Sequence, residues 1–351
     1  MTPTSVIAAA ASFALVVLLV PLVVKMCARW KLYDWPGPLK IHRQPVPRLG
    51  GIAVTLAILG GILLSTCFSS LVELLVFAAI VLICTVGAID DVHGLSATVR
   101  LTAQVAAGAL LWLGCGKSTV LGSAALGLVG SCLFTVAIVN SLNFLDGADG
   151  IASGVAGIIA VGYGVLTWPA YDRPAVALAW AVAGSCAGFL PFNLGAKIFL
   201  GDCGSTVLGL CVALLGLRFY HSSLSSGPRL LFPLIVAGLP LLDMTLAVLR
   251  RIRARASPCL GDRRHVSDLL AARGMSGRTV ALVCYGVTIL FVLIGSVAWT
   301  GKPALFFVLA SVSVGTLLAA AIRMGALRLE ATGPQQTEHG FAEAHPSHEI
   351  S

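Results

Sequence analysis

Long uncharged stretches constrain this chain more than any other feature of its sequence. Residues 5–24 contain no charged side chain, and an α-helix needs about 20 such residues to cross a bilayer. This first stretch is too long for the core of a signal peptide, so we expect a retained helix. The sequence predicts an all-α, polytopic membrane helix bundle with about 11 transmembrane helices, at about 5–27, 50–68, 71–89, 99–115, 123–142, 150–168, 175–191, 204–219, 230–248, 278–299 and 302–323.

Composition agrees with lipid as the solvent of this chain. Hydrophobic residues make up 58% of it and charged residues only 11%, whereas soluble domains carry about 25% charged residues. The 38 glycines suit the close packing of membrane helices. The 10 cysteines form no Cys-x-x-Cys pair and are expected to pack as small apolar side chains. We expect one integral membrane domain over residues 1–330 and a polar, disordered cytoplasmic tail over 331–351.

The positions of lysine and arginine predict the orientation of the bundle, because cytoplasmic connections carry an excess of both. With the N-terminus outside and eleven alternating spans, most of the 23 Lys and Arg residues fall on the inner side. The outer side keeps only Lys117, Arg173, Arg218, Arg229 and Lys302. We therefore predict a cytoplasmic C-terminus and a place in the bacterial inner (plasma) membrane. The net charge of +8 reflects this topology, and no nucleic-acid partner is expected.

Acidic residues gather at the cytoplasmic connections of the same topology. A secondary transporter would fit the number of spans, but its working carboxylates tend to lie near the bilayer midplane. Only Glu73 and Asp243 lie well inside a predicted span, and Asp243 is near an inner end. A group of acids at the cytoplasmic ends of the helices suits a site that joins a soluble polar molecule to a lipid head group. These acids are Asp90, Asp91, Asp146, Asp149, Asp202, Asp262 and Asp268.

The first polar segment is Gly87-Ala-Ile-Asp90-Asp91-Val-His-Gly-Leu95-Ser96, at the inner end of the third stretch. Adjacent carboxylates at a helix end can hold Mg²⁺, and one of them can orient or deprotonate a phosphate nucleophile. Solvation of a helix end is the structural alternative for such a pair.

The second polar segment joins two apolar stretches and contains Asn140, Asn143, Asp146 and Asp149 within ten residues. Side-chain amides can contact a metal ion or a pyrophosphate, and a carboxylate can accept the imide N–H of a uracil. A glycine-rich turn in which Asn caps the next helix is the alternative.

The third polar segment runs from Asn193 to Ser205 and places Asp202 between two glycines. Glycine lets the backbone approach a ligand closely, Asp202 is a natural Mg²⁺ ligand, and Phe199 can stack on a base. The alternatives are a lipid-facing Phe199 and an Asp202 that only caps a helix.

The fourth polar segment is the basic connection 250–278, which contains Asp262-Arg263-Arg264-His265. Arginines supply bidentate donors to phosphate oxygens. The arginines over 250–255 fit an anchor on anionic lipid instead. Lys40, in the connection 28–49, is a further candidate phosphate contact.

The motifs DDxxxLS, NxxNxxDGxDG, NxxAKxFxGDxGS and SP…DRxH, in this order, resemble those of the polyprenyl-phosphate N-acetylhexosamine-1-phosphate transferase family (glycosyltransferase 4). That family includes the enterobacterial-antigen and teichoic-acid initiating enzymes. The resemblance covers about residues 30 to 280. It implies transfer of an N-acetylhexosamine-1-phosphate from a UDP-sugar to undecaprenyl phosphate, with release of UMP, and GlcNAc-1-phosphate is the group we expect. This step initiates a lipid-linked cell-envelope glycan.

The resemblance also implies partners and residue roles. The partners would be UDP-N-acetylhexosamine, polyprenyl phosphate, the bilayer and, in a homodimer, a second copy of the chain. Asp202 would bind Mg²⁺, or Mn²⁺ in its place, with help from Asn143. Asp90, Asp91 and His265 are the candidate catalytic residues. Substrate binding would fall to Lys40, Asn140, Asp146, Asp149, Asn193, Phe199, Arg263 and Arg264.

One departure concerns the loop that helps to recognise the donor in the family. The family commonly continues as HIHH, HHH or HxSH, whereas this chain has His265-Val-Ser267-Asp268. The donor therefore stays open between GlcNAc, GalNAc and a modified hexosamine. The phospho-MurNAc-pentapeptide translocase, a more distant relative, is disfavoured by the missing triple-His run and by eleven rather than ten spans.

Two further alternatives concern the chemistry. A CDP-alcohol phosphotransferase is disfavoured because no arginine completes a DGxxAR element after Asp146. We expect direct attack of the lipid phosphate on the β-phosphorus of the donor, with an aspartyl-phosphate intermediate as the alternative.

Overall fold

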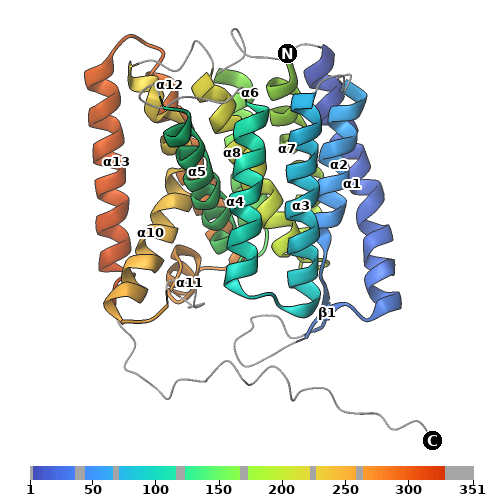
Figure 1. The fold of residues 1–351 in the computed structure, drawn as a ribbon. Helices are drawn as coiled ribbons and strands as arrows, with labels where there is room; N and C mark the ends of the chain where they lie inside the picture. Colours follow the sequence, from blue (N-terminus) through green and yellow to red (C-terminus); the bar gives the residue numbers. More distant parts are fainter. Residues whose placement is uncertain are drawn as a thin grey trace, which may run out of the picture.

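The computed structural model is a bundle of long α-helices (Figure 1) and describes residues 3–35, 44–65, 71–115, 123–166, 173–221, 227–257 and 264–328. A two-residue antiparallel pair joins β1 (Tyr33–Asp34) to β2 (Val46–Pro47). The helices on the eleven predicted stretches are α1 (Pro3–Trp30), α2 (Gly50–Ser65), α3 (Leu71–His93), α4 (Ala97–Gly114), α5 (Ala124–Leu145), α6 (Ile151–Leu166), α7 (Arg173–Asn193), α8 (Asp202–His221), the pair α9 (Phe232–Val236) and α10 (Gly238–Arg253), α12 (Gly277–Val297) and α13 (Pro303–Arg323).

Fewer than eleven of the described helices are both long enough and apolar enough to cross a membrane. Among the described helices, seven are long and apolar enough to cross a membrane, namely α1, α3, α5, α7, α8, α12 and α13, and the pair α9–α10 is an eighth candidate. The chain is therefore a multi-pass membrane protein. The count of eleven and the orientation remain predictions. In Figure 1, α1 begins near the top of the bundle and α13 ends near the bottom. The first residue of α1 and the last residue of α13 therefore lie at opposite ends of the bundle.

The stretch 230–248, predicted as one span, is broken in the structure. A short 3₁₀ helix (Gly227–Leu231) and α9 precede α10, and the two halves of the pair are bent by 67°. Proline at 240 has no N–H to donate to the carbonyl of Val236, so the helical hydrogen-bond ladder is interrupted there. A Cβ at Gly238 would lie 2.9 Å from the ring of Phe291, so glycine at this position lets α12 approach the bend.

Small residues let α2 and α7 pack closely against α1. A Cβ at Gly61 of α2 would lie 1.9 Å from the Ser12 hydroxyl of α1, and one at Gly184 of α7 would lie 2.2 Å from the Ala9 carbonyl. These close approaches suit membrane helices, which associate through packing of small residues. Large apolar side chains such as Leu18 remain exposed on the outer faces, as contact with lipid would require.

The helices that carry the polar segments lie side by side. The helices α3, α4, α5 and α8 are neighbours, and α10 packs against α5 (Figure 1). The short helix α11 (Val266–Ala271) lies beside the lower part of α10, at the end of the bundle where α3 turns into α4 (Figure 1). The sequence motifs therefore converge on one end of the structure.

Candidate active site

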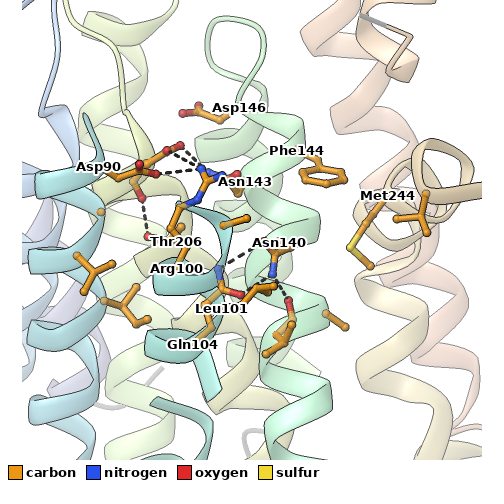
Figure 2. Close-up of a pocket in the computed structure, with 18 of the residues that line it drawn as sticks. Asp90, Arg100, Leu101, Gln104, Asn140, Asn143, Phe144, Asp146, Thr206 and Met244 are labelled. Atoms are coloured by element: carbon orange, nitrogen blue, oxygen red, sulfur yellow. Dashed lines mark hydrogen bonds and ion pairs between the residues drawn. The ribbon is translucent and has the colours of Figure 1, made fainter. Parts of the chain in front are cut away.

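A cavity of about 720 Å³ opens between α3, α4, α5, α8 and α10 (Figure 2). One part of its wall is polar, and the predicted residues that line it are Asp90, Asn140, Asn143, Asp146, Asp202 and His265. Four further polar residues that line it are Arg100, Gln104, Thr206 and Arg251. The remaining wall is mostly apolar and includes Ile83, Val86, Leu101, Leu133, Val136, Phe144, Met244 and Val248.

Asp90 is buried at the end of α3, and both of its carboxylate oxygens are engaged. The backbone N–H of Leu95 donates to Oδ1 at 2.5 Å, and Nη1 of Arg100 lies 3.0 Å from Oδ2. The chain reaches Leu95 through Gly94, whose φ of +68° is a conformation that glycine adopts without strain. The turn after α3 and the first turn of α4 therefore fix the direction of this carboxylate.

Arg100 joins two of the predicted acids, although it is not among the site residues predicted from the sequence. Its Nη1 also lies 3.7 Å from Oδ2 of Asp202, so one guanidinium spans Asp90 and Asp202 (Figure 2). Ser96 caps α4, which places Arg100 in the first turn and Gln104 one turn later on the same face. The sequence contains one signal for a functional Arg100, because an arginine in the first turn of a largely apolar helix is unusual.

Asn143 and Asp202 meet across the α5–α8 interface. The Asn143 amide donates to Oδ1 of Asp202 at 2.7 Å and to the hydroxyl of Ser205 at 3.0 Å. About one turn away, the Asn140 amide donates to Oε1 of Gln104 at 2.5 Å. The two asparagines of this motif therefore face the same cavity but hold different partners.

Asp91 points away from the cavity and caps α8. Its Oδ1 accepts the backbone N–H of Asp202 at 2.9 Å, and its Oδ2 accepts that of Cys203 at 3.0 Å. A Cβ at Gly201 would lie 2.6 Å from Oδ2, so glycine makes room for the carboxylate. Arg48 donates to the Asp91 carbonyl at 2.8 Å. The predicted catalytic role of Asp91 does not match this placement, because both of its carboxylate oxygens accept backbone N–H groups at the start of α8.

The turn 146–150 carries the two aspartates of the second segment. Burial raises the pKa of the Asp146 carboxyl well above its usual range, and neighbouring carboxylates, first that of Asp202, raise it further. Asp149 lies in the same turn but does not line the cavity. Asn193, predicted to bind substrate, is buried and instead shapes this turn. Its Oδ1 accepts the Gly150 N–H at 2.9 Å and its amide donates to the carbonyl of Ile198 at 3.2 Å.

Phe199 lies outside the cavity wall. Its backbone N–H donates to the carbonyl of Pro47 at 2.9 Å, and its carbonyl accepts the N–H of Gly50 at 3.0 Å. These contacts bind the segment before Asp202 to the start of α2. Arg264 is likewise turned away, because Nη1 donates to the carbonyl of Arg328 at 2.8 Å. Lys40, Arg263 and the predicted tail 331–351 lie outside the described residues.

The wall formed by α10 contains an arginine that the sequence analysis assigned to a lipid anchor. Arg251 is buried, and its guanidinium carbon lies 4.8 Å from the centre of the Phe144 ring. The ring of His265 lies 5.5 Å from the same ring, edge to face. Arg250 is buried too and donates to the carbonyl of Ala326. An anchor on surface lipid therefore does not account for these two arginines.

The donor set at the polar end fits Mg²⁺. Among the described residues, no group of three or more His, Cys, Asp or Glu side chains is arranged to hold a metal ion. Protein Mg²⁺ sites, however, use one or two carboxylates and complete their octahedron with water and phosphate oxygens. Asp90 and Asp202 both contact Arg100 and so lie close together, with the Asn143 amide beside Asp202. Two carboxylates and one amide are hard oxygen donors of the required kind.

Comparisons with known proteins agree with the motifs. Residues 73–220 match the family described as glycosyl transferase family 4. The chain is 33% identical over 331 residues to a decaprenyl-phosphate N-acetylglucosaminephosphotransferase of Mycolicibacterium smegmatis, covering 80% of this chain and 77% of the relative. It is 32% identical over 331 residues to the Mycobacterium tuberculosis protein of the same name, covering 80% and 78%.

A more distant relative is the undecaprenyl-phosphate alpha-N-acetylglucosaminyl 1-phosphate transferase of Escherichia coli, 29% identical over 300 residues and 78% of each chain. The range 73–220 that matches the family includes Asp90, Asn143 and Asp202. The chain therefore belongs to glycosyl transferase family 4, the family of the polyprenyl-phosphate N-acetylhexosamine-1-phosphate transferases.

Proposed function

We propose that this chain transfers N-acetylhexosamine-1-phosphate, with GlcNAc-1-phosphate the expected group, from a UDP-sugar to undecaprenyl phosphate. UMP is released, and the lipid-linked product starts a cell-envelope glycan. One observation carries the proposal: a single cavity has a polar end at Asp90, Arg100 and Asp202 and otherwise apolar walls. The names of the relatives, decaprenyl- and undecaprenyl-phosphate GlcNAc phosphotransferases, support the same reaction.

The apolar walls suit the prenyl chain of the acceptor. Leu133 and Val136 face the cavity from α5, and Met244 and Val248 face it from α10. Figure 2 shows Met244 on the side opposite Asp90. A prenyl tail between these two helices would bring its phosphate toward the polar end while the chain stays in apolar surroundings. Arg251 follows Val248 on the same face of α10 and would meet that phosphate.

The polar end must neutralise two anionic reactants. A diphosphate carries about two negative charges and a monophosphate about one to two near neutral pH. Arg100 from α4 and Arg251 from α10 supply two positive charges to the wall of the cavity. Asp202, Asp90 and Asn143 would hold Mg²⁺, which when bound neutralises phosphate charge and polarises the phosphoryl oxygens.

In this proposal, Asp90 orients the attacking phosphate. A carboxylate held by a guanidinium is a weak base, so orientation suits Asp90 better than proton abstraction. In the proposed step, an oxygen of the lipid phosphate forms a bond to the β-phosphorus of the donor. The bond from that phosphorus to the bridging oxygen breaks, and UMP leaves with the electron pair. An aspartyl-phosphate route would instead require Asp90 to leave Arg100.

Release of UMP from defined donors tests the proposal. Purified enzyme would receive undecaprenyl phosphate, Mg²⁺ and, in separate reactions, UDP-GlcNAc, UDP-GalNAc or UDP-MurNAc-pentapeptide. We expect UMP and a lipid-linked sugar diphosphate with an N-acetylhexosamine donor, and neither product when EDTA replaces Mg²⁺. Turnover of UDP-MurNAc-pentapeptide alone would assign the chain to the translocase branch. Turnover with none of these donors would contradict the proposed reaction.

We also propose that the polar end of the cavity faces the cytoplasm across the bacterial inner membrane. The lysine and arginine distribution supports this orientation, since most of these residues fall on the side of the motifs. Reporter fusions after residue 328 and within 116–122 test it. A fluorescent protein that requires the cytoplasm should fluoresce only at the first position, and alkaline phosphatase should be active only at the second. The opposite pattern would reverse the orientation.

A further inference from the structure

Gln104 is a buried polar residue of α4 that no sequence motif predicted and that the proposed reaction does not use. Only 4% of it is exposed, yet it lines the cavity. It lies one helical turn beyond Arg100, further from the polar end. A buried amide is unfavourable unless its donors and acceptors are hydrogen-bonded, so the partners of this side chain bear directly on its role.

Asn140 determines which way round the Gln104 amide lies. Nδ2 of Asn140 donates to the carbonyl of Val136 at 2.8 Å and to Oε1 of Gln104 at 2.5 Å (Figure 2). A backbone carbonyl only accepts, so the nitrogen of Asn140 must be the atom beside it. Both hydrogens on that nitrogen are therefore engaged, and the oxygen of Gln104 is the atom that faces it.

The amide pair leaves one donor for the cavity. Nε2 of Gln104 carries two hydrogens, and Oδ1 of Asn140, at 3.4 Å, is its only acceptor among the residues that the structure describes. The second hydrogen on Nε2 is thus available to a bound molecule. A buried donor gains most from an acceptor that enters with such a molecule.

The pair lies at the border between the polar end and the apolar walls. Along α5, Asn143 lies about one turn from Asn140 toward the polar end, and Val136 and Leu133 line the cavity on the other side. Figure 2 shows the pair on the side of Asn143 away from Asp146. A prenyl phosphate that reaches the polar end along the apolar walls therefore passes this pair, and its phosphate is the group at the border.

We propose that Gln104 binds a phosphate oxygen of the acceptor lipid through the second hydrogen on Nε2, and that Asn140 holds the Gln104 amide in the required direction. The inference rests on the proposed function, which brings the prenyl phosphate to this cavity. A hydrogen bond to an anionic oxygen is stronger than one between neutral groups. A neutral amide also suits this depth, because a charged side chain costs more in apolar surroundings.

Binding of the acceptor without a donor tests the contact. Purified enzyme in detergent would be titrated with undecaprenyl phosphate and, separately, with undecaprenol, which has the same chain but no phosphate. We expect Gln104→Met to weaken binding of undecaprenyl phosphate about tenfold or more and to leave binding of undecaprenol unchanged. Thr102→Val, at an exposed position on the same helix, is the matched control. It should bind the phosphate as the wild type does.

A clamp between α4 and α5 is the structural alternative, since Asn and Gln hydrogen bonds also join membrane helices. Gln104→Met and Asn140→Leu both break the pair, but only the first removes the donor. We expect similar falls in thermal midpoint and a larger rise in the acceptor KM for Gln104→Met, with the KM for the UDP-sugar near the wild-type value. Equal acceptor KM values in the two variants would make the pair a clamp only and overturn the inference.

The remaining outcomes separate this inference from the proposed function. If the wild-type enzyme binds no undecaprenyl phosphate, the proposed function fails. If it binds the lipid and Gln104→Met binds it as tightly, only the inference fails. An equal loss of undecaprenol binding would place Gln104 on the prenyl chain, and a change confined to the donor KM would place it on the UDP-sugar. Both results would contradict a contact with the acceptor phosphate.

Discussion

The carboxylate of Asp91 accepts the backbone N–H of Asp202 at 2.9 Å, while its neighbour Asp90 faces the cavity. The two adjacent acids therefore do different work. Asp90 contacts Arg100 at the polar end, and Asp91 holds the first turn of the helix that carries Asp202. A negative charge at a helix N-terminus is favourable both as a cap and through the helix dipole.

Substitution should separate these roles. Asp91→Ala removes the cap, so we expect a loss of about 1–2 kcal/mol in stability, a lower thermal midpoint and, because Asp202 is displaced, weaker Mg²⁺-dependent turnover. Asp90→Asn should lose turnover while its midpoint stays near that of the wild type. Thermal unfolding in detergent, together with UMP release at several Mg²⁺ concentrations, measures both effects. Equal midpoints for wild type and Asp91→Ala would argue against the capping role.

Arg100 is expected to be essential for turnover. Arg100→Gln leaves Asp90 and Asp202 without the guanidinium that spans them and removes a charge that faces the phosphates. We expect kcat/KM to fall about 10²-fold or more. Arg278→Gln, at an exposed position in the first turn of α12, is the matched control for loss of one positive charge. Comparable activity of the two variants would remove Arg100 from the site.

Arg251 should act mainly on the acceptor lipid, because it shares a helix face with Met244 and Val248. Arg251→Gln is expected to raise KM for undecaprenyl phosphate about tenfold, with a smaller change in KM for the UDP-sugar. Initial rates with each substrate varied in turn measure the split. Phe144→Leu, which removes the ring beneath the guanidinium, should shift the same constant by less. A change confined to the donor KM would place Arg251 on the pyrophosphate instead.

Asp146 links stability to pH. Its folded pKa lies above the unfolded one, so its contribution to stability is complete at low pH and is lost as the pH rises through the folded pKa. Asp146→Asn stays neutral and should unfold at a higher temperature than the wild type at alkaline pH. The difference should shrink at acidic pH. Thermal midpoints across the pH range, without substrate or metal, check this expectation, and a difference independent of pH would contradict it.

Gly51 should tolerate no side chain. A Cβ there would lie 2.1 Å from the backbone nitrogen of Gly204, next to Asp202. Gly51→Ala must push apart α2 and the start of α8, so we expect destabilisation of about 1–3 kcal/mol and impaired turnover. Gly130→Ala, at a helical position where nothing lies within 4 Å of the added Cβ, should leave both unchanged. Wild-type midpoints for both variants would show that the two segments can separate without cost.

The helices and the centre of the site were within reach of sequence reasoning. Uncharged stretches predict membrane helices because lipid excludes charge. The motifs predicted that Asp90, Asn143, Asp202 and His265 share one site, and all four line the cavity. Their shared position at helix ends on one side of the bundle made that prediction possible.

The sequence alone does not predict the directions in which individual side chains point. Asp90 and Asp91 diverge because adjacent helical residues point about 100° apart, and the sequence does not show which of them faces α8. Arg251 appeared to be a surface charge because the sequence does not show that α5 covers it. The role of Asn193 depends on a turn at Gly150 whose φ is +77°, and such backbone states follow from tertiary contacts.

The turn after α13 is hydrogen-bonded both to α10 and to the loop that carries His265. Arg250 binds the carbonyl of Ala326, and Arg264 binds that of Arg328. A chain shortened to end after Arg328 would keep both acceptors, whereas one that ended before Ala326 would remove the acceptors of Arg250 and Arg264. A truncation should therefore keep the residues up to Arg328, although this end lies far from the cavity residues in sequence.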